Sequence, residues 1–315
     1  MRILVTGASG LLGLNLALEA AKDHTVFGQV NSHSLRFSPF TVLEADLLAP
    51  GAGDCGATLD RLLEQAQPDW VIHCAALAIV DACEADPARA RKLNTEVPGK
   101  LAELVARGGA RLVHISTDAV FDGQRGGYIE EDEPNPLGVY AHTKLDGERA
   151  VAQANPQAII ARVNLHGWSL SGKRSLSEFF FYNLQAGKQV QGFTDVFFCP
   201  LLANDLAHIL VKMLAAGLNG LYHVVSSDCI SKYEFGIALA RRFGLEERLI
   251  SPASVASGGL KAARSPNLTL RTEKLASALR QPLPGISTGL EGLYTLYQQG
   301  YPQKLREFGN QENRD

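Results

Sequence analysis

The sequence lacks any apolar run that approaches the roughly 18 residues needed to cross a bilayer. A signal peptide is not expected either, because Met1-Arg2 leads directly into a short apolar run that ends at Thr6-Gly7. Neither sign of charge is in excess, since 30 basic and 33 acidic residues give a net charge of −3. We therefore expect a cytoplasmic protein with no nucleic-acid partner and no membrane partner.

Cysteine is scarce, and its spacing forms no recognisable framework. The five cysteines, an odd number without a CxxC pair, are Cys55, Cys74, Cys83, Cys199 and Cys229. This pattern predicts reduced, buried thiols rather than a disulfide framework or a structural zinc site. No spacing of His, Cys and Asp supports a metal site, and none is predicted.

The first half of the chain alternates short apolar runs with amphipathic helical runs. The expected strands are Arg2–Thr6, Thr25–Val30, Trp70–Cys74, Arg111–Ser116 and Ala158–Val163, and the expected helices are Leu11–Lys22, Leu59–Gln67, Pro87–Arg107 and Val139–Asn155. The strands are continuous apolar runs, which is typical of parallel strands buried on both faces. The order predicts an α/β fold with a Rossmann-type, doubly wound parallel sheet.

After Asn164 the sequence becomes more irregular and richer in aromatic residues. We expect an NAD(P)-binding domain over residues 1–165 and a smaller α/β substrate-binding region over residues 166–315, with the option that the chain crosses back. Ser231 and Glu234 have the spacing of a capping box and predict a helix that runs to Phe243. Further elements are expected at Ser175–Gly187, Asp205–Leu214, Leu221–Val225 and Thr288–Gln299.

A glycine-rich turn follows the first strand and opens the first helix. Gly7, Gly10 and Gly13 allow a tight turn and a close backbone approach, and the helix N-terminus then offers free N–H groups to a pyrophosphate. The residues between these glycines complete the predicted cofactor-binding turn: Ser9, Leu11 and Leu12.

The end of the second strand bears on the choice of cofactor. An acidic residue there would bind the adenosine ribose hydroxyls and repel a 2′-phosphate, but the chain has Asn31, Ser32, His33 and, further on, Arg36. This neutral-to-basic stretch favours NADP(H), and NAD(H) stays open as the alternative.

The strongest chemical signal is Tyr140-Ala-His-Thr-Lys144, because residues four apart share one face of a helix. A neighbouring ammonium stabilises a phenolate, so Lys144 is expected to lower the pKa of Tyr140. Thr117 lies 23 residues earlier, at the end of a predicted strand, where its hydroxyl can orient a carbonyl group. The set predicts Thr117, Tyr140 and Lys144 as catalytic residues, with Tyr140 as the general acid and Tyr140 and Lys144 also at the cofactor.

These motifs resemble the extended short-chain dehydrogenase/reductases, specifically the dTDP-4-dehydrorhamnose reductase family. The resemblance is carried by Ser116-Thr-Asp-Ala-Val-Phe-Asp-Gly123, by Tyr140-Ala-His-Thr-Lys-Leu-Asp-Gly-Glu148 and, more loosely, by Arg162, Tyr222-His223 and Arg264-Ser-Pro-Asn267. It implies reduction of a 4-keto sugar on a nucleoside diphosphate, and a homodimer. It also implies cofactor contacts at Asp46, Leu47, Cys74, Ala75, Ala76 and Asn94, and substrate contacts at Thr117, Asp118, Asn164, Arg264 and Asn267.

The sequence departs from that family in the region expected to bind the sugar. Ala119 stands where an aromatic residue is usual, and Leu165 stands where Trp is usual, with Trp168 displaced by three positions. The product therefore need not be dTDP-rhamnose. Two other hypotheses stay open: a nucleotide-sugar epimerase that retains NAD, and a non-enzymatic NADP-binding regulatory subunit similar to the β subunit of methionine adenosyltransferase.

Overall fold

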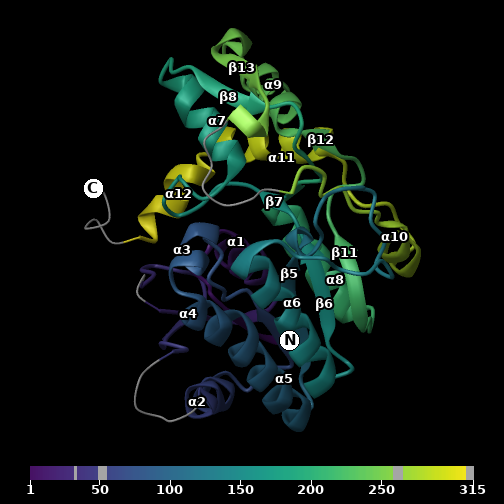
Figure 1. The fold of residues 1–315 in the computed structure, drawn as a ribbon. Coiled ribbons are helices and arrows are strands. Elements are labelled where there is room, and N and C mark those ends of the chain that lie inside the picture. Colours follow the sequence, from purple (N-terminus) through teal and green to yellow (C-terminus); the bar gives the residue numbers. More distant parts are fainter. Residues whose placement is uncertain (32–33, 49–54, 258–264, 310–315) are drawn as a thin grey trace.

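The protein is described here by a computed structural model that covers residues 1–31, 34–48, 55–257 and 265–309. A seven-stranded sheet lies at its centre, with neighbouring strands in the order β11-β6-β5-β4-β1-β2-β3 (Figure 1). The strands are β1 (Arg2–Thr6), β2 (Thr25–Val30), β3 (Thr41–Glu44), β4 (Trp70–His73), β5 (Arg111–Thr117), β6 (Ile159–Val163) and β11 (Gly220–Val224). Every neighbouring pair is parallel, which confirms the predicted fold class.

Alternate side chains of the central strands enter two separate cores. Leu4 and Val71 pack with residues of α2 (Gly56–Ala66) and α5 (Val97–Gly108). Ile3 and Ile72, one residue out of register with them, pack with residues of α1 (Leu11–Ala20) and α8 (Ala203–Ala215). The apolar runs in the sequence are continuous because helices cover both faces of the sheet.

The helix predicted over Pro87–Arg107 is divided into α4 (Pro87–Arg91), a π-helical turn η1 (Lys92–Glu96) and α5. Pro98 has no N–H group to donate to the carbonyl of Asn94, so a regular α-helix cannot continue through this point. A Cβ atom added to Gly147 would lie only 2.2 Å from that carbonyl oxygen. The turn and the glycine together let α6 (Gly138–Ala154) approach closely.

The chain returns to the sheet after the proposed domain boundary. Strand β11 and helix α8 both come after residue 165. Nevertheless β11 lies beside β6, and α8 packs against α1. The division into residues 1–165 and 166–315 remains a prediction, and the seventh strand comes from its second part.

The rest of the second half forms a smaller layered region at one end of the molecule (Figure 1). Its helices are α7 (Leu176–Gln185), α9 (Lys232–Phe243) and α11 (Ile286–Gln298). Three short helices lie elsewhere in the chain: α3 (Val80–Ala85), α10 (Glu273–Leu279) and α12 (Tyr301–Glu307). Short strand pairs join it: β7 (Leu165–His166) with β10 (Leu201–Leu202), β9 (Phe197–Phe198) with β12 (Ile230–Ser231), and β8 (Val190–Phe193) with β13 (Ile250–Ala253). The capping box of Ser231 and Glu234 is present as predicted.

The prediction that all the cysteines are reduced was wrong for one pair. Cys199 and Cys229, separated by 30 residues, form a disulfide, while Cys55, Cys74 and Cys83 are not in a disulfide. The pairing has no short-range signal in the sequence, because the excursion through α8 and β11 is what brings the two residues together. Among the described helices, none has the length and apolar character that a membrane span requires.

Candidate functional site

The glycine-rich turn has the geometry of a dinucleotide cradle. Gly7 has a φ of +69°, and a Cβ atom added there would lie 2.8 Å from the backbone nitrogen of Ala75. A Cβ atom on Gly13 would lie 2.2 Å from the carbonyl oxygen of Gly7, so only glycine lets α1 pack against the turn. Helix α1 begins at Leu11 and its N-cap residue, Gly10, provides no side-chain cap. Its first N–H groups therefore suit a pyrophosphate, and the turn fits the predicted cofactor.

The other predicted residues of the turn, Ser9, Leu11 and Leu12, lie in the same segment, with Leu12 buried and the other two half-buried. Cys74, Ala75 and Ala76 follow β4 and approach the turn from the side, since the Ala75 N–H donates to Thr6 Oγ1 at 3.4 Å. Small residues are needed here because the backbone of the turn lies against them.

The carboxyl ends of β2 and β3 meet at the expected adenosine end of the cradle. Asn31 Nδ2 lies 3.5 Å from Asp46 Oδ1, and the same oxygen accepts the N–H of Leu48 at 2.9 Å. Leu47, which lies between Asp46 and Leu48 in the sequence, is buried. Ser32 and His33 lie outside the described residues. Arg36 is exposed, and its N–H donates to the carbonyl of Phe308.

Thr117 and the Tyr140–Lys144 pair meet where β5 and α6 pack together. Thr117 is the last residue of β5, and Tyr140 and Lys144 lie one turn apart on α6. The Thr117 side chain lies near that of Tyr140, and its hydroxyl acts to lower the pKa of the phenol. Lys144 is buried, and its Nζ donates to the carbonyl of Ile115 at 2.7 Å and lies 3.5 Å from His114 Nε2. The fold thus brings the predicted triad together.

The pKa of Tyr140 differs from the expectation. Burial of the phenolic oxygen raises this pKa to about 12, and the Thr117 hydroxyl offsets only part of the rise. Burial also lowers the pKa of Lys144 to about 8, against the opposing effect of the Glu148 carboxylate. The lowering by Lys144 that the sequence predicted is absent from the causes of the Tyr140 shift, because desolvation of both groups dominates.

Asn94 is buried between helices and is not exposed at a surface. Its side chain exchanges hydrogen bonds with the backbone of Leu77, at 2.9 and 3.1 Å, and its Nδ2 also donates to Thr143 Oγ1 at 3.1 Å. The residue sits in the π-helical turn and is buried. It therefore ties the segment after β4 to helix α6, between Tyr140 and Lys144.

Two of the predicted substrate residues face each other. Asn164 Nδ2 donates to Asp118 Oδ2, and Thr117 Oγ1 donates to Asp118 Oδ1 at 3.1 Å. Burial raises the pKa of the Asp118 carboxyl to about 6, although both hydrogen bonds and the charge of Lys232 act in the other direction. Lys232, the first residue of α9, was not predicted at the site, although it lies inside the predicted capping box of Ser231 and Glu234.

The remaining substrate predictions are less direct. Asn267 Oδ1 accepts hydrogen bonds from the N–H and hydroxyl of Thr269, and the Asn267 N–H donates to the carbonyl of Gly123. Asn267 thus holds the loop after Asp118, and its side-chain oxygen is already bonded. Arg264 lies outside the described residues.

A buried ion pair beneath the triad was not predicted as part of the site. Glu148 accepts a bidentate hydrogen bond from Arg162, at 3.0 and 2.8 Å, and a further one from Ser116 Oγ at 2.5 Å. Both charged side chains are buried, and Arg162 stacks on Phe121. Because Glu148 lies four residues after Lys144, the same helical spacing that identified the Tyr–Lys pair could have identified it.

Other buried rings lie in the core. His73 and His114 are buried, and their rings stack with centroids 5.6 Å apart. Phe180 and Phe181 of α7 are likewise buried. The part of the chain that the structure describes contains no group of three or more His, Cys, Asp or Glu residues arranged to hold a metal ion.

The chain matches the family described as RmlD substrate binding domain over residues 1–298. It is 32% identical over 299 residues to the probable low-salt glycan biosynthesis reductase Agl14 of Haloferax volcanii, covering 93% of this chain and 97% of that protein. It is 33% identical over 289 residues to dTDP-4-dehydrorhamnose reductase of Mycobacterium tuberculosis, covering 90% and 88%. The mouse methionine adenosyltransferase 2 subunit beta is 31% identical over 285 residues, covering 87% and 81%.

Solved structures share the fold along nearly the whole chain. A dTDP-4-dehydrorhamnose reductase of Clostridium acetobutylicum superimposes with a TM-score of 0.79 at 26% identity and covers 95% of this chain and 100% of that one. The Bacillus anthracis reductase in complex with NADP (TM-score 0.79, 24% identity, 93% and 98% covered) has the same fold. So does the Bordetella bronchiseptica enzyme WbmG in complex with NAD and UDP (TM-score 0.79, 20% identity, 98% and 97% covered). With the glycine-rich turn and the triad in place, this chain belongs to the RmlD substrate binding domain family.

Proposed function

We propose that this protein is an NAD(P)H-dependent reductase that acts on the 4-keto group of a nucleotide-linked sugar, in the manner of a short-chain dehydrogenase/reductase. The observation that carries the proposal is the convergence of Thr117, Tyr140 and Lys144 at the edge of the sheet where the glycine-rich turn opens α1. The reductase relatives support the coarser conclusion that the chain is an NAD(P)-dependent oxidoreductase.

Each residue of the triad has its own role in the proposed reaction. A bound reduced nicotinamide would supply a hydride to the carbonyl carbon, and the turn from Gly7 to Gly13 would hold its pyrophosphate. Thr117 would orient the carbonyl oxygen of the substrate by turning toward it the hydroxyl proton that Asp118 accepts in this structure. Tyr140 gives its phenolic proton to that oxygen, which is reasonable because a pKa of about 12 keeps the phenol protonated until a stronger base develops beside it.

Lys144 and Asp118 support this proton transfer from two sides. The Lys144 ammonium is held by the carbonyl of Ile115 and would reach the nicotinamide ribose from there. Asp118, bonded to Thr117 and Asn164, holds the Thr117 hydroxyl in place before the substrate binds. Water is kept from the centre because Thr117, Asp118 and Lys144 are all buried.

The sugar and the nucleoside are left open by these residues. A nucleotide-sugar substrate is supported by relatives named as dTDP-4-dehydrorhamnose reductases and by a solved structure of the same fold that contains UDP. Ala119 leaves the position after Asp118 without a functional side chain, which speaks for a reduction rather than an elimination. The methionine adenosyltransferase relatives keep a regulatory role as the alternative, but they are no more similar than the reductases.

Three further properties belong to the same proposal. NADP(H) is the favoured cofactor, because the residue that follows β2 is Asn31 rather than an acidic residue. The protein would act in the cytoplasm, where nucleotide sugars and NADPH are found, and as a homodimer. NADP and NAD both occur in solved structures of this fold, so a direct comparison of NADPH and NADH binding is needed.

The Tyr140→Phe variant tests the proposed chemistry. It keeps the ring but removes the proton donor, so oxidation of NADPH with a 4-keto-6-deoxy sugar nucleotide should fall by roughly 100-fold or more. NADPH binding should change little. Tyr294→Phe, in the aromatic cluster with Phe243, is the matched control and should keep full turnover. Unchanged turnover of Tyr140→Phe would refute the mechanism.

A further inference from the structure

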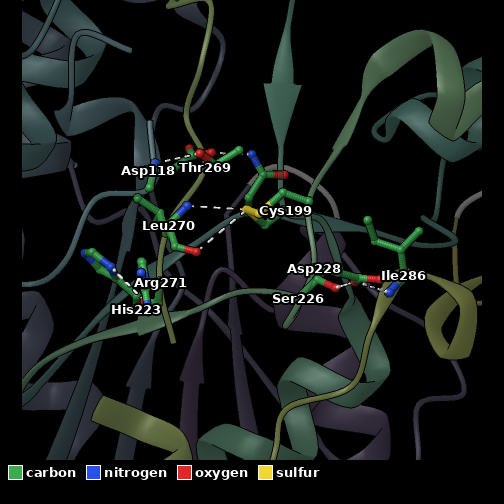
Figure 2. The surroundings of a disulfide bond; sticks show 12 residues. Asp118, Cys199, His223, Ser226, Asp228, Thr269, Leu270, Arg271 and Ile286 are labelled. Atoms are coloured by element: carbon green, nitrogen blue, oxygen red, sulfur yellow. Dashed lines mark hydrogen bonds between the residues drawn. A yellow bond between two sulfur atoms is a disulfide. The ribbon is translucent and has the colours of Figure 1, made fainter. Parts of the chain in front are cut away.

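The Cys199–Cys229 disulfide joins two loops of the second half of the chain. Cys199 lies between β9 and β10 and is fully buried, whereas Cys229 lies between β11 and β12 and is exposed. A backbone hydrogen bond from Ser226 to the carbonyl of Cys199, at 3.1 Å, closes the same junction. Figure 2 shows the disulfide with Cys199 bonded to the backbone of Leu270 and with the Ser226, Asp228 and Ile286 contacts nearby.

Cys199 belongs to a small apolar cluster next to the proposed sugar pocket, which is the set of Thr117, Asp118, Asn164 and Asn267. The cluster also contains Val120 and Phe121, which follow Asp118 in the chain after Ala119. Cys199 Sγ accepts the N–H of Leu270 at 3.3 Å. The disulfide therefore packs against the segment that carries the residues expected to orient the substrate.

The segment that contains Cys199 also contacts the pocket from the other side. The N–H of Leu201 donates to the carbonyl of Asn164 at 2.9 Å, and the Asn164 side chain is bonded to Asp118. Phe197 exchanges backbone hydrogen bonds with Pro266 and Leu268 in the segment that includes Asn267. Residues 197–201 thus link three parts of the proposed pocket, and the disulfide is the covalent bond that restrains them.

We propose that this disulfide is a thiol–disulfide exchange site that controls binding of the sugar nucleotide. The co-reactant is a dithiol, either a small molecule or a two-cysteine protein reductant. Its thiolate attacks the sulfur of exposed Cys229, the S–S bond breaks, and Cys199 leaves as a thiolate that takes up a proton. The second thiolate of the reductant then attacks the mixed disulfide and releases Cys229 as a thiol, so the reductant leaves as a disulfide and the protein gains two electrons and two protons.

The difference in burial between the two cysteines decides which sulfur atom the thiolate attacks. An attacking thiolate needs access to the sulfur, and Cys229 is exposed while Cys199 is enclosed by apolar side chains. In a reducing compartment, a disulfide that persists is usually catalytic or redox-sensing rather than purely structural. The cytoplasm proposed above is such a compartment.

Reduction should loosen the pocket without unfolding the region. Asp228, the residue before Cys229, accepts the N–H of Ile286 at 2.7 Å and the hydroxyl of Ser226 at 2.8 Å, and these bonds hold the loop to α11 after the S–S bond is broken. The cofactor turn lies between β1 and α1, whereas residues 197–201 belong to the separate strand pairs β9–β12 and β7–β10. Sugar-nucleotide binding should weaken while NADPH binding persists. This effect rests on the proposed function, whereas the exchange reaction does not.

The test uses the full-length protein in graded dithiothreitol, followed by differential alkylation and peptide mass spectrometry. Cys199 and Cys229 should become reducible together, and glutathione should form its mixed disulfide at Cys229. Hydrogen exchange over residues 197–201 and 225–230 should accelerate by roughly fivefold on reduction, because a restrained segment has gained freedom. Peptides over residues 2–13 should not change. Titration with UDP and with dTDP should show a dissociation constant raised about fivefold, with that of NADPH unchanged.

The Cys199→Ala/Cys229→Ala double variant is the control. It should show the rapid exchange of the reduced protein with or without dithiothreitol. Glutathione found on Cys199, or unchanged exchange over residues 197–201 after complete reduction, would overturn the proposal. If neither nucleotide binds either form, the proposed substrate class fails, while the alkylation and hydrogen-exchange results still decide whether the exchange site exists.

Discussion

Lys144 and Asp118 are both buried beside the proposed reacting centre, and burial disfavours the charged form of each. The pKa of the Lys144 ammonium is lowered to about 8 and that of the Asp118 carboxyl is raised to about 6. The two shifts leave both groups charged only within a narrow range around neutral pH. This range is where the proposed chemistry should work best, and it makes both residues testable by titration.

The pH dependence of activity should report Lys144. As the pH rises through about 8, the ammonium is lost and kcat/KM should fall. Glu148→Gln removes the carboxylate that raises this pKa, so the fall should move to lower pH. The effect of Lys144 on stability has the opposite sign. Between about pH 8 and pH 10.5 this side chain is protonated in the unfolded chain but neutral in the folded protein, so the free energy of unfolding rises with pH in this range. Asp146→Asn on the same helix is the control, and an identical profile for Glu148→Gln would contradict the assignment.

Asp118→Asn should separate stability from function. The folded pKa of about 6 lies above the ordinary value of 3.8 for this carboxyl, so wild-type stability should decline as the pH rises from about 4 to 6. The neutral amide removes this dependence and should raise the free energy of unfolding at pH 7 by up to roughly 3 kcal/mol. Urea denaturation at pH 5 and pH 7 measures it. Asp195→Asn should behave in the opposite way, because hydrogen bonds from Ser254 and Val255 lower the pKa of Asp195.

At the scale of elements, the site depends on close approaches between backbones. Gly13 lets α1 pack against the turn at Gly7, and Gly147 lets α6 pack against the π-helical turn that holds Asn94. The positions of Tyr140 and Lys144 relative to the cofactor turn follow from these two contacts. A side chain at either glycine would move a whole helix rather than a single group.

The Gly13→Ala variant tests the first contact. Its Cβ atom would lie 2.2 Å from the carbonyl of Gly7, so the turn must open and NADPH affinity should fall by at least about tenfold. Gly108→Ala is the matched control, since its Cβ atom would meet nothing within 4 Å and a helical alanine should stabilise by about 0.5–1 kcal/mol. Calorimetric titration with NADPH would compare the two. Wild-type affinity in Gly13→Ala would exclude the turn as the pyrophosphate site.

At the scale of the whole molecule, the chain leaves the sheet after β6, builds part of the second region and returns as β11. This return places Cys229 beside Cys199 and brings α8 against α1. The two halves are therefore joined by the sheet, by helix packing and by a covalent bond, and the junction forms the wall of the proposed pocket.

Reduction of the disulfide should lower global stability as well as loosen the pocket. Closing a loop of 30 residues restricts the unfolded chain, which corresponds to roughly 3 kcal/mol. Urea denaturation of the oxidised and reduced protein should show this difference, with similar slopes. The Cys199→Ala/Cys229→Ala variant should match the reduced form, and equal stability of the two redox forms would show that the loop closure contributes nothing.

Local patterns account for most of what could be predicted. The strands of the first half, the turn at Gly7–Gly13 and the Tyr140–Lys144 pair all rest on neighbours in sequence, and the structure has them with boundaries shifted by a few residues at most. The division of the Pro87–Arg107 helix was missed, although Pro98 supplied a local reason for it. Short strands such as β7 and β12 could not be predicted, because two residues carry no periodic pattern.

The sequence by itself determined the α/β fold, the glycine-rich turn and the set of residues proposed to be catalytic, because buried parallel strands, glycine turns and helical spacing are local in origin. Only the tertiary structure decided the pKa of Tyr140, the Glu148–Arg162 pair beneath it and the Cys199–Cys229 bond. Desolvation depends on everything packed around a group, and partners distant in sequence meet only when the sheet is assembled.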